Sequence, residues 1–165
     1  MAALTTPRVT PAKGPLVAAG PFGCAASKTL YVGGVVCLDP SGYVTNGSTG
    51  SSLICTGVLG NQPNGIPAPS VSTSSVAGGT IVEVQQGEFL LDNDVSNPVV
   101  TADIGHACFL LDDHTVSHFA PGSPSRCIAG TVRNVNPTGT SEPNGIGVWV
   151  KLGTVEPFQG TGPYG

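Results

Sequence analysis

Apolar residues along this chain come in short runs that end at Gly, Pro, Asn, Asp or Ser, a pattern that predicts strands and turns. Long unbroken segments are rare because the 165 residues include 24 Gly and 15 Pro. Either residue inside a helix costs about 1 to 3 kcal/mol. We therefore expect an all-β protein with a small β-barrel or β-sandwich body.

The expected strands cover most of the chain. They are 30–38, 43–45, 53–59, 80–86, 88–91, 99–101, 106–111, 115–119, 127–135 and 147–152, with a short edge strand at Val71 in the long polar loop 60–79. The runs 31–38 and 107–111 are apolar at nearly every position, which indicates strands that are covered on both faces. A barrel or sandwich that also packs against a neighbour fits this pattern.

A strand–turn–strand pattern occurs twice. Segments 33–44 and 104–116 each contain an apolar run, an Asp-led turn and a β-branched segment. In both copies a Gly-containing strand, a Pro-Asn-Gly-Ile loop and a Val-x-Val strand follow, and the copies lie 66 to 80 residues apart. These later segments are 54–59 and 127–132, 63–66 and 143–146, and 82–84 and 148–150. We interpret the body as two diverged β units.

The pattern divides the chain into an extended N-terminal arm at 1–28, a β body at 29–153 and a C-terminal tail at 154–165. Prolines at 7, 11, 15 and 21 stiffen the arm. Because the arm and the tail bury little apolar surface, we expect neighbouring molecules to order them. A chain that starts at Lys28 is then expected to keep a folded body but to attach weakly.

Charge is scarce, at 10% of residues against about 25% in an ordinary globular domain. This favours a protein packed against others; a secreted domain such as a lectin is the alternative. Residues 1–38 contain Arg8, Lys13 and Lys28 and no acid, although the net charge of the chain is −4. Such an arm predicts docking on an acidic neighbour and is too sparse for nucleic acid.

The cysteines at 24, 37, 55, 108 and 127 are odd in number, and four lie in apolar strand runs. This arrangement is typical of buried, reduced thiols and predicts assembly in a reducing cytoplasm. The sequence shows neither the apolar core of a secretory signal nor an apolar run of membrane-spanning length, so no membrane partner is expected.

Candidate catalytic and metal-binding residues are few. His114 and His118, on a turn and strand, are predicted to lie roughly 13 Å apart, too far for one zinc ion. The acids at 92, 94, 103, 112 and 113 are interpreted as turn formers in preference to a calcium site. We expect no catalytic residue, metal or cofactor. A hydrolase that joins His106, Asp103 and a Ser or Cys is the catalytic alternative.

The chain has few aromatic residues that could form a platform for sugar binding, since it contains one Trp and three Tyr. Trp149 lies between Val148 and Val150, so its side chain is expected to face the opposite way from theirs. The sequence leaves open whether it fills the core or forms an exposed contact.

Several segments together resemble the small capsid decoration proteins of tailed bacteriophages, also called cement or head-stabilising proteins. They are GVVCLDPSGYV at 34–44, GVL at 57–59, GTIVEVQQG at 79–87, ADIGHACFLLDD at 102–113 and AGTV at 129–132. The likeness spans roughly residues 30–153 and rests on pattern and turn placement.

This resemblance implies a non-catalytic β body that binds the outer surface of an assembled head and stabilises it, commonly as a trimer. The implied partners are the major capsid protein and further copies of the chain. We expect Arg8, Lys13 and Lys28 of the arm and Phe158 and Tyr164 of the tail to be partner-binding residues. The alternatives are a receptor- or glycan-binding head-fibre or lectin-like module, and a shell-forming or connector subunit.

Overall fold

The computed structural model is all-β, as expected, in the residues that it describes, which are 3–50, 52–60, 70–118, 127–136 and 147–152. Within these ranges no helix reaches the length and hydrophobicity of a membrane span. The elements are β1 (Ala12–Gly23), β2 (Thr29–Tyr31), β3 (Val35–Leu38), β4 (Val44–Asn46), β5 (Ile54–Leu59), β6 (Ser70–Ser72), β7 (Ile81–Asn93), the 3-10 turn η1 (Thr101–Asp103), β8 (Ala107–Leu110), β9 (Thr115–Ser117), β10 (Ile128–Asn136) and β11 (Gly147–Leu152).

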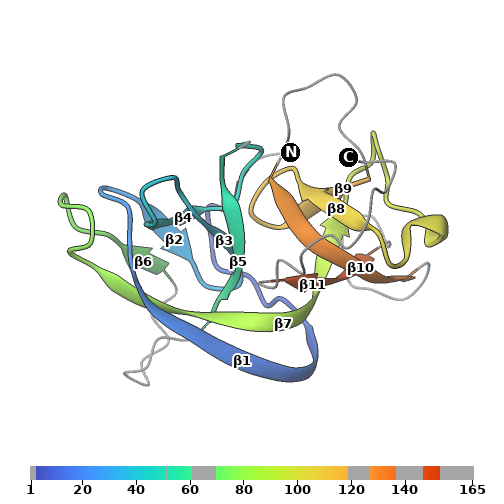
Figure 1. Ribbon diagram of the computed structural model, residues 1–165, viewed down its shortest axis with the longest axis horizontal. Helices are drawn as coiled ribbons and strands as arrows, with labels where there is room; N and C mark the ends of the chain where they lie inside the picture. The colour runs from blue at the N-terminus through green and yellow to red at the C-terminus, as the bar shows by residue number, and fades with distance from the viewer. Residues whose placement is uncertain (1–2, 51, 61–69, 119–126, 137–146, 153–165) are drawn as a thin grey trace.

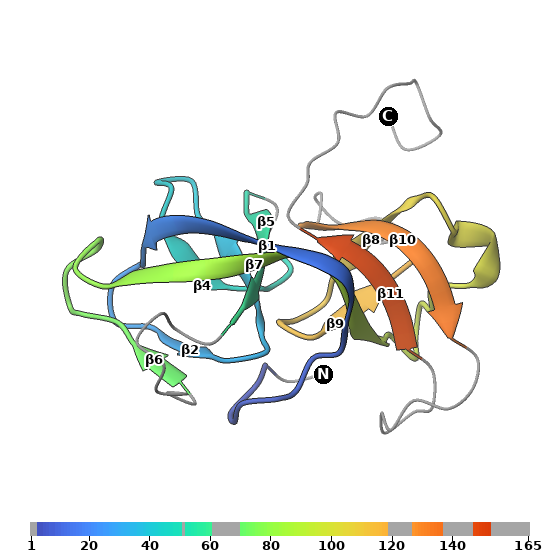
Figure 2. The same ribbon diagram turned by 90° about the horizontal axis from the view of Figure 1, so that it is seen from below.

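The strands form two lobes that share β7, the long strand that runs through both (Figures 1 and 2). In the C-terminal lobe, β7, β9, β8, β10 and β11 pair in that order, and β11 returns to β7 to close a barrel. In the N-terminal lobe, β7 pairs with β5, β5 with β3 and β3 with β4. A parallel bridge between Cys24 and Val44 then joins β4 to the end of β1, which itself pairs with β7.

The two lobes repeat one pairing scheme. Each has an opening strand, a hairpin, a strand that pairs back on the hairpin, and a closing strand. These are β1, β3–β4, β5 and the first half of β7 in one lobe, and the second half of β7, β8–β9, β10 and β11 in the other. The segments in which the sequence pattern repeats therefore lie on equivalent strands.

Equivalent glycines stand beside irregularities in β5 and β10. The register shifts beside Gly57, where β3 meets β5, and beside Gly130, where β8 meets β10. A Cβ on Gly57 would overlap the carbonyl oxygen of Gln85, and one on Gly130 would overlap that of Lys151. Both positions require glycine because the backbone of the next strand passes too close for a side chain.

Each lobe has an apolar core, and β3 contributes to both. Val36 is buried in the N-terminal core, whereas Val35 and Cys37 are buried in the C-terminal core. This explains why 31–38 is apolar at nearly every position: the second face of β3 is covered by the other lobe. β8 differs, since Cys108 and Leu110 are buried but Ala107 and Phe109 are only half-buried.

The N-terminal segment is extended, as expected, but the chain itself orders it. Strand β1 lies antiparallel to β7, from Ala12 opposite Phe89 to Gly23 opposite Ile81. Pro15 and Pro21 fall in the two interruptions of this register, where a missing amide hydrogen costs no regular pairing. The expectation that outside molecules must order this segment is therefore wrong. The tail 154–165 lies outside the described residues.

Two smaller expectations have opposite outcomes. The edge strand at Val71 is confirmed as β6, which pairs with β2. The strand expected at 99–101 is wrong, because the side-chain amide of Asn93 hydrogen-bonds both backbone groups of Val99 at 2.8 Å and takes the place of a partner strand. The chain then turns into η1.

Candidate functional site

The N-terminal segment is clasped, before it enters β1, by backbone oxygens of the N-terminal lobe and by carboxylates of the C-terminal lobe. Arg8 Nη2 lies 3.2 Å from Asp92 Oδ1 at the end of β7, and the two side chains are 13% and 12% exposed. The amide of Arg8 donates to the carbonyl oxygen of Val32 at 3.0 Å. Thr10 Oγ1 donates to the carbonyl oxygen of Gly33. Arg8, expected as a partner contact, is thus largely buried within its own chain.

The clasp continues at the turn between β8 and β9. The amide of Leu4 donates to the Asp113 carboxylate at 2.9 and 3.2 Å, and His114 Nδ1 lies 2.9 Å from Asp113 Oδ1. The hydrogen bond to Asp113 raises the pKa of His114 above its usual 6.5, and the nearby charges of Asp112 and Asp92 raise it further against the opposing effect of burial. The His114 ring therefore lies among three carboxylates that favour its protonated form.

Asp112 forms the turn itself, as expected for an Asp-led pattern. Its Oδ1 accepts the amides of His114 and Thr115 at 3.0 and 2.8 Å. The ligand atoms of Asp112, Asp113 and His114 lie within 4.8 Å of one another, a spacing that suits a metal ion. Hydrogen bonds from within the chain already reach each of these three residues, while Asp112 Oδ2 is buried without a hydrogen-bond partner among the described residues. Arg8 adds positive charge beside Asp92, so we interpret the cluster as a structural clasp.

The other histidines and acids are divided among separate interactions. His118 Nδ1 lies 2.8 Å from Asp103 Oδ1, apart from the contacts of His114 with Asp112 and Asp113. The second oxygen of Asp103 accepts the amide of Val100, and the amide of His106 donates to the backbone oxygen of Asp103. Asp103 is thus occupied by His118 and by the turn η1, which differs from the pairing with His106 that a hydrolase would use.

All five cysteines are buried, and their thiols have properties opposite to those of an activated nucleophile. Desolvation raises the pKa of Cys108 to about 12. Cys37 Sγ and Cys127 Sγ lie 3.7 Å apart, and their contact and burial raise the pKa of Cys127 far above that of a free thiol. These side chains behave as small apolar groups in the C-terminal core.

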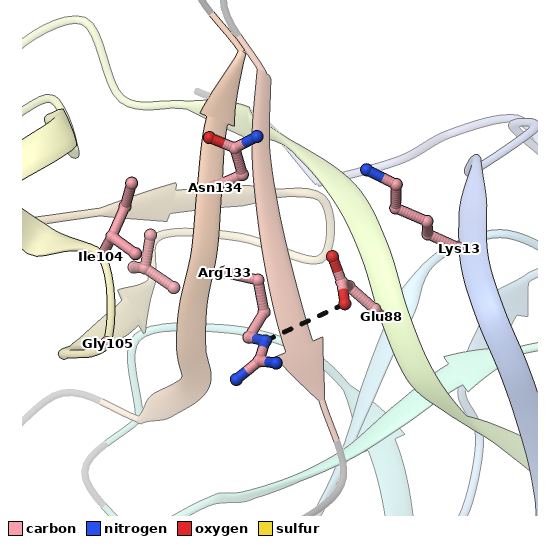
Figure 3. Close-up of a pocket in the computed structure, with 7 residues that line it drawn as sticks. Lys13, Glu88, Ile104, Gly105, Arg133 and Asn134 are labelled. Atoms are coloured by element: carbon pink, nitrogen blue, oxygen red, sulfur yellow. Dashed lines mark ion pairs between the residues drawn. The ribbon is translucent and has the colours of Figure 1, made fainter.

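A second group of functional side chains lies on the outer face of the C-terminal barrel. Lys13 on β1 and Lys151 on β11 each stand opposite Glu88 on β7 in the sheet register. Arg133 on β10 approaches from the other side, with its Nε 3.9 Å from Glu88 Oε2. Figure 3 shows Glu88 between Arg133 and Lys13.

An open cavity of about 510 Å³ lies beside these charges. Its walls are formed by charged, amide and aliphatic residues from the three strands β1, β7 and β10 and from the loop before β8: Lys13, Glu88, Ile104, Gly105, Val132, Arg133 and Asn134 (Figure 3). Such a mixture can bind a charged group and an apolar group of one ligand at the same time.

Trp149 belongs to this outer face and not to the core. Val148 and Val150 on either side are fully buried, which turns the indole outward. There the Lys13 ammonium lies 5.1 Å from the centre of the indole ring, within the range of a cation–π interaction. Trp149 stands opposite Asn134, a residue of the cavity wall.

The remaining predicted contact residues are not brought together. Lys28 is exposed on the N-terminal lobe, where its amide donates to Thr73 Oγ1 at 2.7 Å. Phe158 and Tyr164 lie outside the described residues. The sequence did not single out Arg133 and Lys151, because 120 residues separate Lys13 from Arg133 and only the sheet register unites them. The alternation of apolar and polar residues in β11 was the one available signal.

No protein-family model, no curated protein and no solved structure matches this chain.

Proposed function

We propose that this chain is a structural virion protein, a capsid decoration protein that binds the outer surface of a phage head. The observation that carries the proposal is the exposure of β1. None of its residues is buried, and residues 14–27 contain no charged side chain. A long uncharged strand on the outside of a protein with few charges is a surface that a neighbouring molecule can cover.

The apolar side chains of β1 support this reading. Leu16 and Val17 are 40% and 60% exposed, next to prolines that leave the strand edge poorly suited to amyloid-like growth. A rigid two-lobed body that carries such a surface suits repeated attachment to a regular shell. Trimers at three-fold positions would multiply weak contacts through effective concentration.

Binding to the assembled shell alone would stabilise that shell by mass action. In this proposal the partners are the major capsid protein and further copies of the chain, and the tail residues Phe158 and Tyr164 add contacts. Buried, protonated thiols are compatible with assembly in the reducing cytoplasm of the host.

The test uses two lysine substitutions at equally exposed valines. Val17 on β1 is 60% exposed and Val95 in the loop after β7 is 67% exposed. Wild-type protein, V17K and V95K are mixed with empty heads assembled from the major capsid protein of the same phage, and are then sedimented. We expect wild-type protein and V95K to sediment with the heads and V17K to stay in solution. Equal binding by all three, or no binding by the wild type, would contradict the proposal.

A second candidate function is glycan recognition, and the position of Trp149 favours it. An outward indole beside a cavity with an amide, Asn134, can form a sugar face when the sugar displaces the Lys13 side chain that lies over the ring. This function predicts that the isolated protein binds glycans on an array and that W149A loses the binding. A decoration protein predicts no glycan binding and retention of head binding by W149A.

A further inference from the structure

Positive charge is concentrated on one face of the C-terminal barrel. The structure describes five of the six cationic side chains, and Arg8 and Lys28 lie in the clasp and on the N-terminal lobe. The other three, Lys13, Arg133 and Lys151, come from three different strands and surround Glu88. Among the side chains that the structure describes, three cations surround one carboxylate here, in a chain whose net charge is −4.

The cavity beside these cations limits which ligands can fit against this face. Arg133 and Lys13 stand at its walls, and the exposed side chain of Ile104 and the backbone of Gly105 line the part next to η1. The amide of Asn134 adds a hydrogen-bond donor and acceptor. A ligand that fits these walls has a carboxylate, a short aliphatic part and peptide-like polar groups.

We propose that this face binds an acidic segment of a partner polypeptide. A guanidinium forms paired hydrogen bonds with a carboxylate, and Arg133 is the cation best placed for this because its side chain is 54% exposed and only 3.9 Å from an existing carboxylate. A glutamate or aspartate of the partner binds the exposed guanidinium of Arg133 at the cavity wall, where Lys13 on the other side of Glu88 adds a second positive charge. A neighbouring aliphatic side chain packs on Ile104.

Nucleic acid fits this face poorly. Its backbone carries a phosphate about every 1.7 Å of duplex, whereas this face offers three cations and a carboxylate in their midst. The indole of Trp149 is covered by Lys13 and so does not present an open platform for a base. The face adjoins the uncharged stretch 14–27 at Lys13 and is otherwise built from β7, β10 and β11. The proposal therefore does not depend on what the chain attaches to through β1.

The single tryptophan makes the test site-specific, because its fluorescence and its indole N–H signal report on this face alone. The full chain is titrated with a short peptide of alternating glutamate and alanine, and in parallel with the peptide in which glutamine replaces glutamate. We expect a saturable change of the Trp149 signal with the glutamate peptide only, and a weaker affinity at higher ionic strength.

R133Q is expected to weaken the binding about fivefold or more, and K13Q likewise. K28Q removes the same charge from the other lobe and should bind as the wild type does. The proposal is overturned if the glutamine peptide binds equally well, if K28Q weakens binding as much as R133Q, or if the glutamate peptide leaves Trp149 unchanged up to millimolar concentration. A duplex DNA or a sugar acid that binds this face more tightly than the glutamate peptide also overturns it.

Discussion

Arg8 and Asp92 lie 3.2 Å apart and join the start of the chain to the end of its central strand. Both side chains are nearly buried, and Asp92 also lies 3.9 Å from His114 Nε2. The pair fixes the N-terminal segment in the seam where the two lobes meet, so the entry into β1 is part of the folded structure. Because of these contacts, the N-terminal segment contributes to the stability of the fold, whether or not it also binds a partner.

The first prediction concerns Arg8 itself. R8A leaves the Asp92 carboxylate without its cation in a poorly hydrated position, and we expect the free energy of unfolding to fall by about 2 to 4 kcal/mol. Urea unfolding followed by circular dichroism measures this. K28A, which removes an exposed cation, should change the free energy by no more than about 0.5 kcal/mol. Similar values for the two variants would show that the clasp contributes little.

Gly33 and Gly42 provide a matched pair for the close approach of the N-terminal segment. Their φ angles are +86° and +83°, so alanine has the same backbone penalty at both positions, about 1 to 2 kcal/mol. At Gly42 nothing lies within 4 Å of an added Cβ, whereas at Gly33 the Cβ would overlap the carbonyl oxygen of Arg8. We expect G33A to be less stable than G42A by a further 2 kcal/mol or so, measured by urea unfolding.

A double variant distinguishes this explanation from a general effect at Gly33. If G33A acts by displacing the segment that carries Arg8, the losses from G33A and R8A should not add, because both act on the same contact. Fully additive losses would place the strain of G33A elsewhere.

Removal of the first 27 residues is the third prediction. The truncated chain lacks β1 and Cys24, so the edge of β7 loses its hydrogen-bonded partner and the N-terminal core loses a fully buried side chain. We expect this variant to be unfolded or aggregated. Its amide NMR signals should then lose the dispersion that the signals of the folded chain show. A chain that starts at Ala3 keeps every described contact and should remain folded. A folded truncated chain would show that β1 is dispensable.

The sequence predicted the strands best where a strand is bounded by breakers and repeats in both lobes. β3, β5 and β11 fall within expected segments, and β10 exceeds its expected segment by one residue, because apolar runs end at Gly, Asp or Asn there. The expected break at Gly87 was wrong: β7 continues through it, since the glycine accommodates the Leu16 side chain of β1. The local pattern predicts where a strand lies, but it does not predict which distant strand packs against it.

β1 illustrates what the local pattern could not reveal. With Gly14, Pro15, Gly20 and Pro21 it has the composition of a linker, and its order comes from pairing with residues more than fifty positions away. The same holds for the outer face of the barrel, where Lys13 and Arg133 meet only through the register of β1, β7, β11 and β10. The sequence shows which side chains are charged, but it does not show that these two lie close together in the fold.

The last prediction is the pH dependence of stability that His114 imposes. Its hydrogen bond to Asp113, with Asp112 and Asp92 nearby and Arg8 opposing them, raises the pKa of the imidazole in the folded state above the usual 6.5. A group whose pKa is higher when folded binds protons more tightly in that state, so its contribution is complete below pH 6.5 and is lost as the pH rises through the folded-state pKa. We therefore expect the free energy of unfolding to decrease as the pH rises above about 6.5.

H114Q should flatten this decrease, because glutamine keeps a hydrogen-bond donor for Asp113 and does not titrate. H106Q, altered at a histidine outside the clasp, should keep the slope of the wild type. Urea unfolding at a series of pH values measures the slopes, and the imidazole proton signals give the pKa of His114 directly. If H114Q and the wild type show the same slope, the imidazolium does not hold the Asp113 turn. The N-terminal clasp would then depend on Arg8 and on the amide of Leu4 alone.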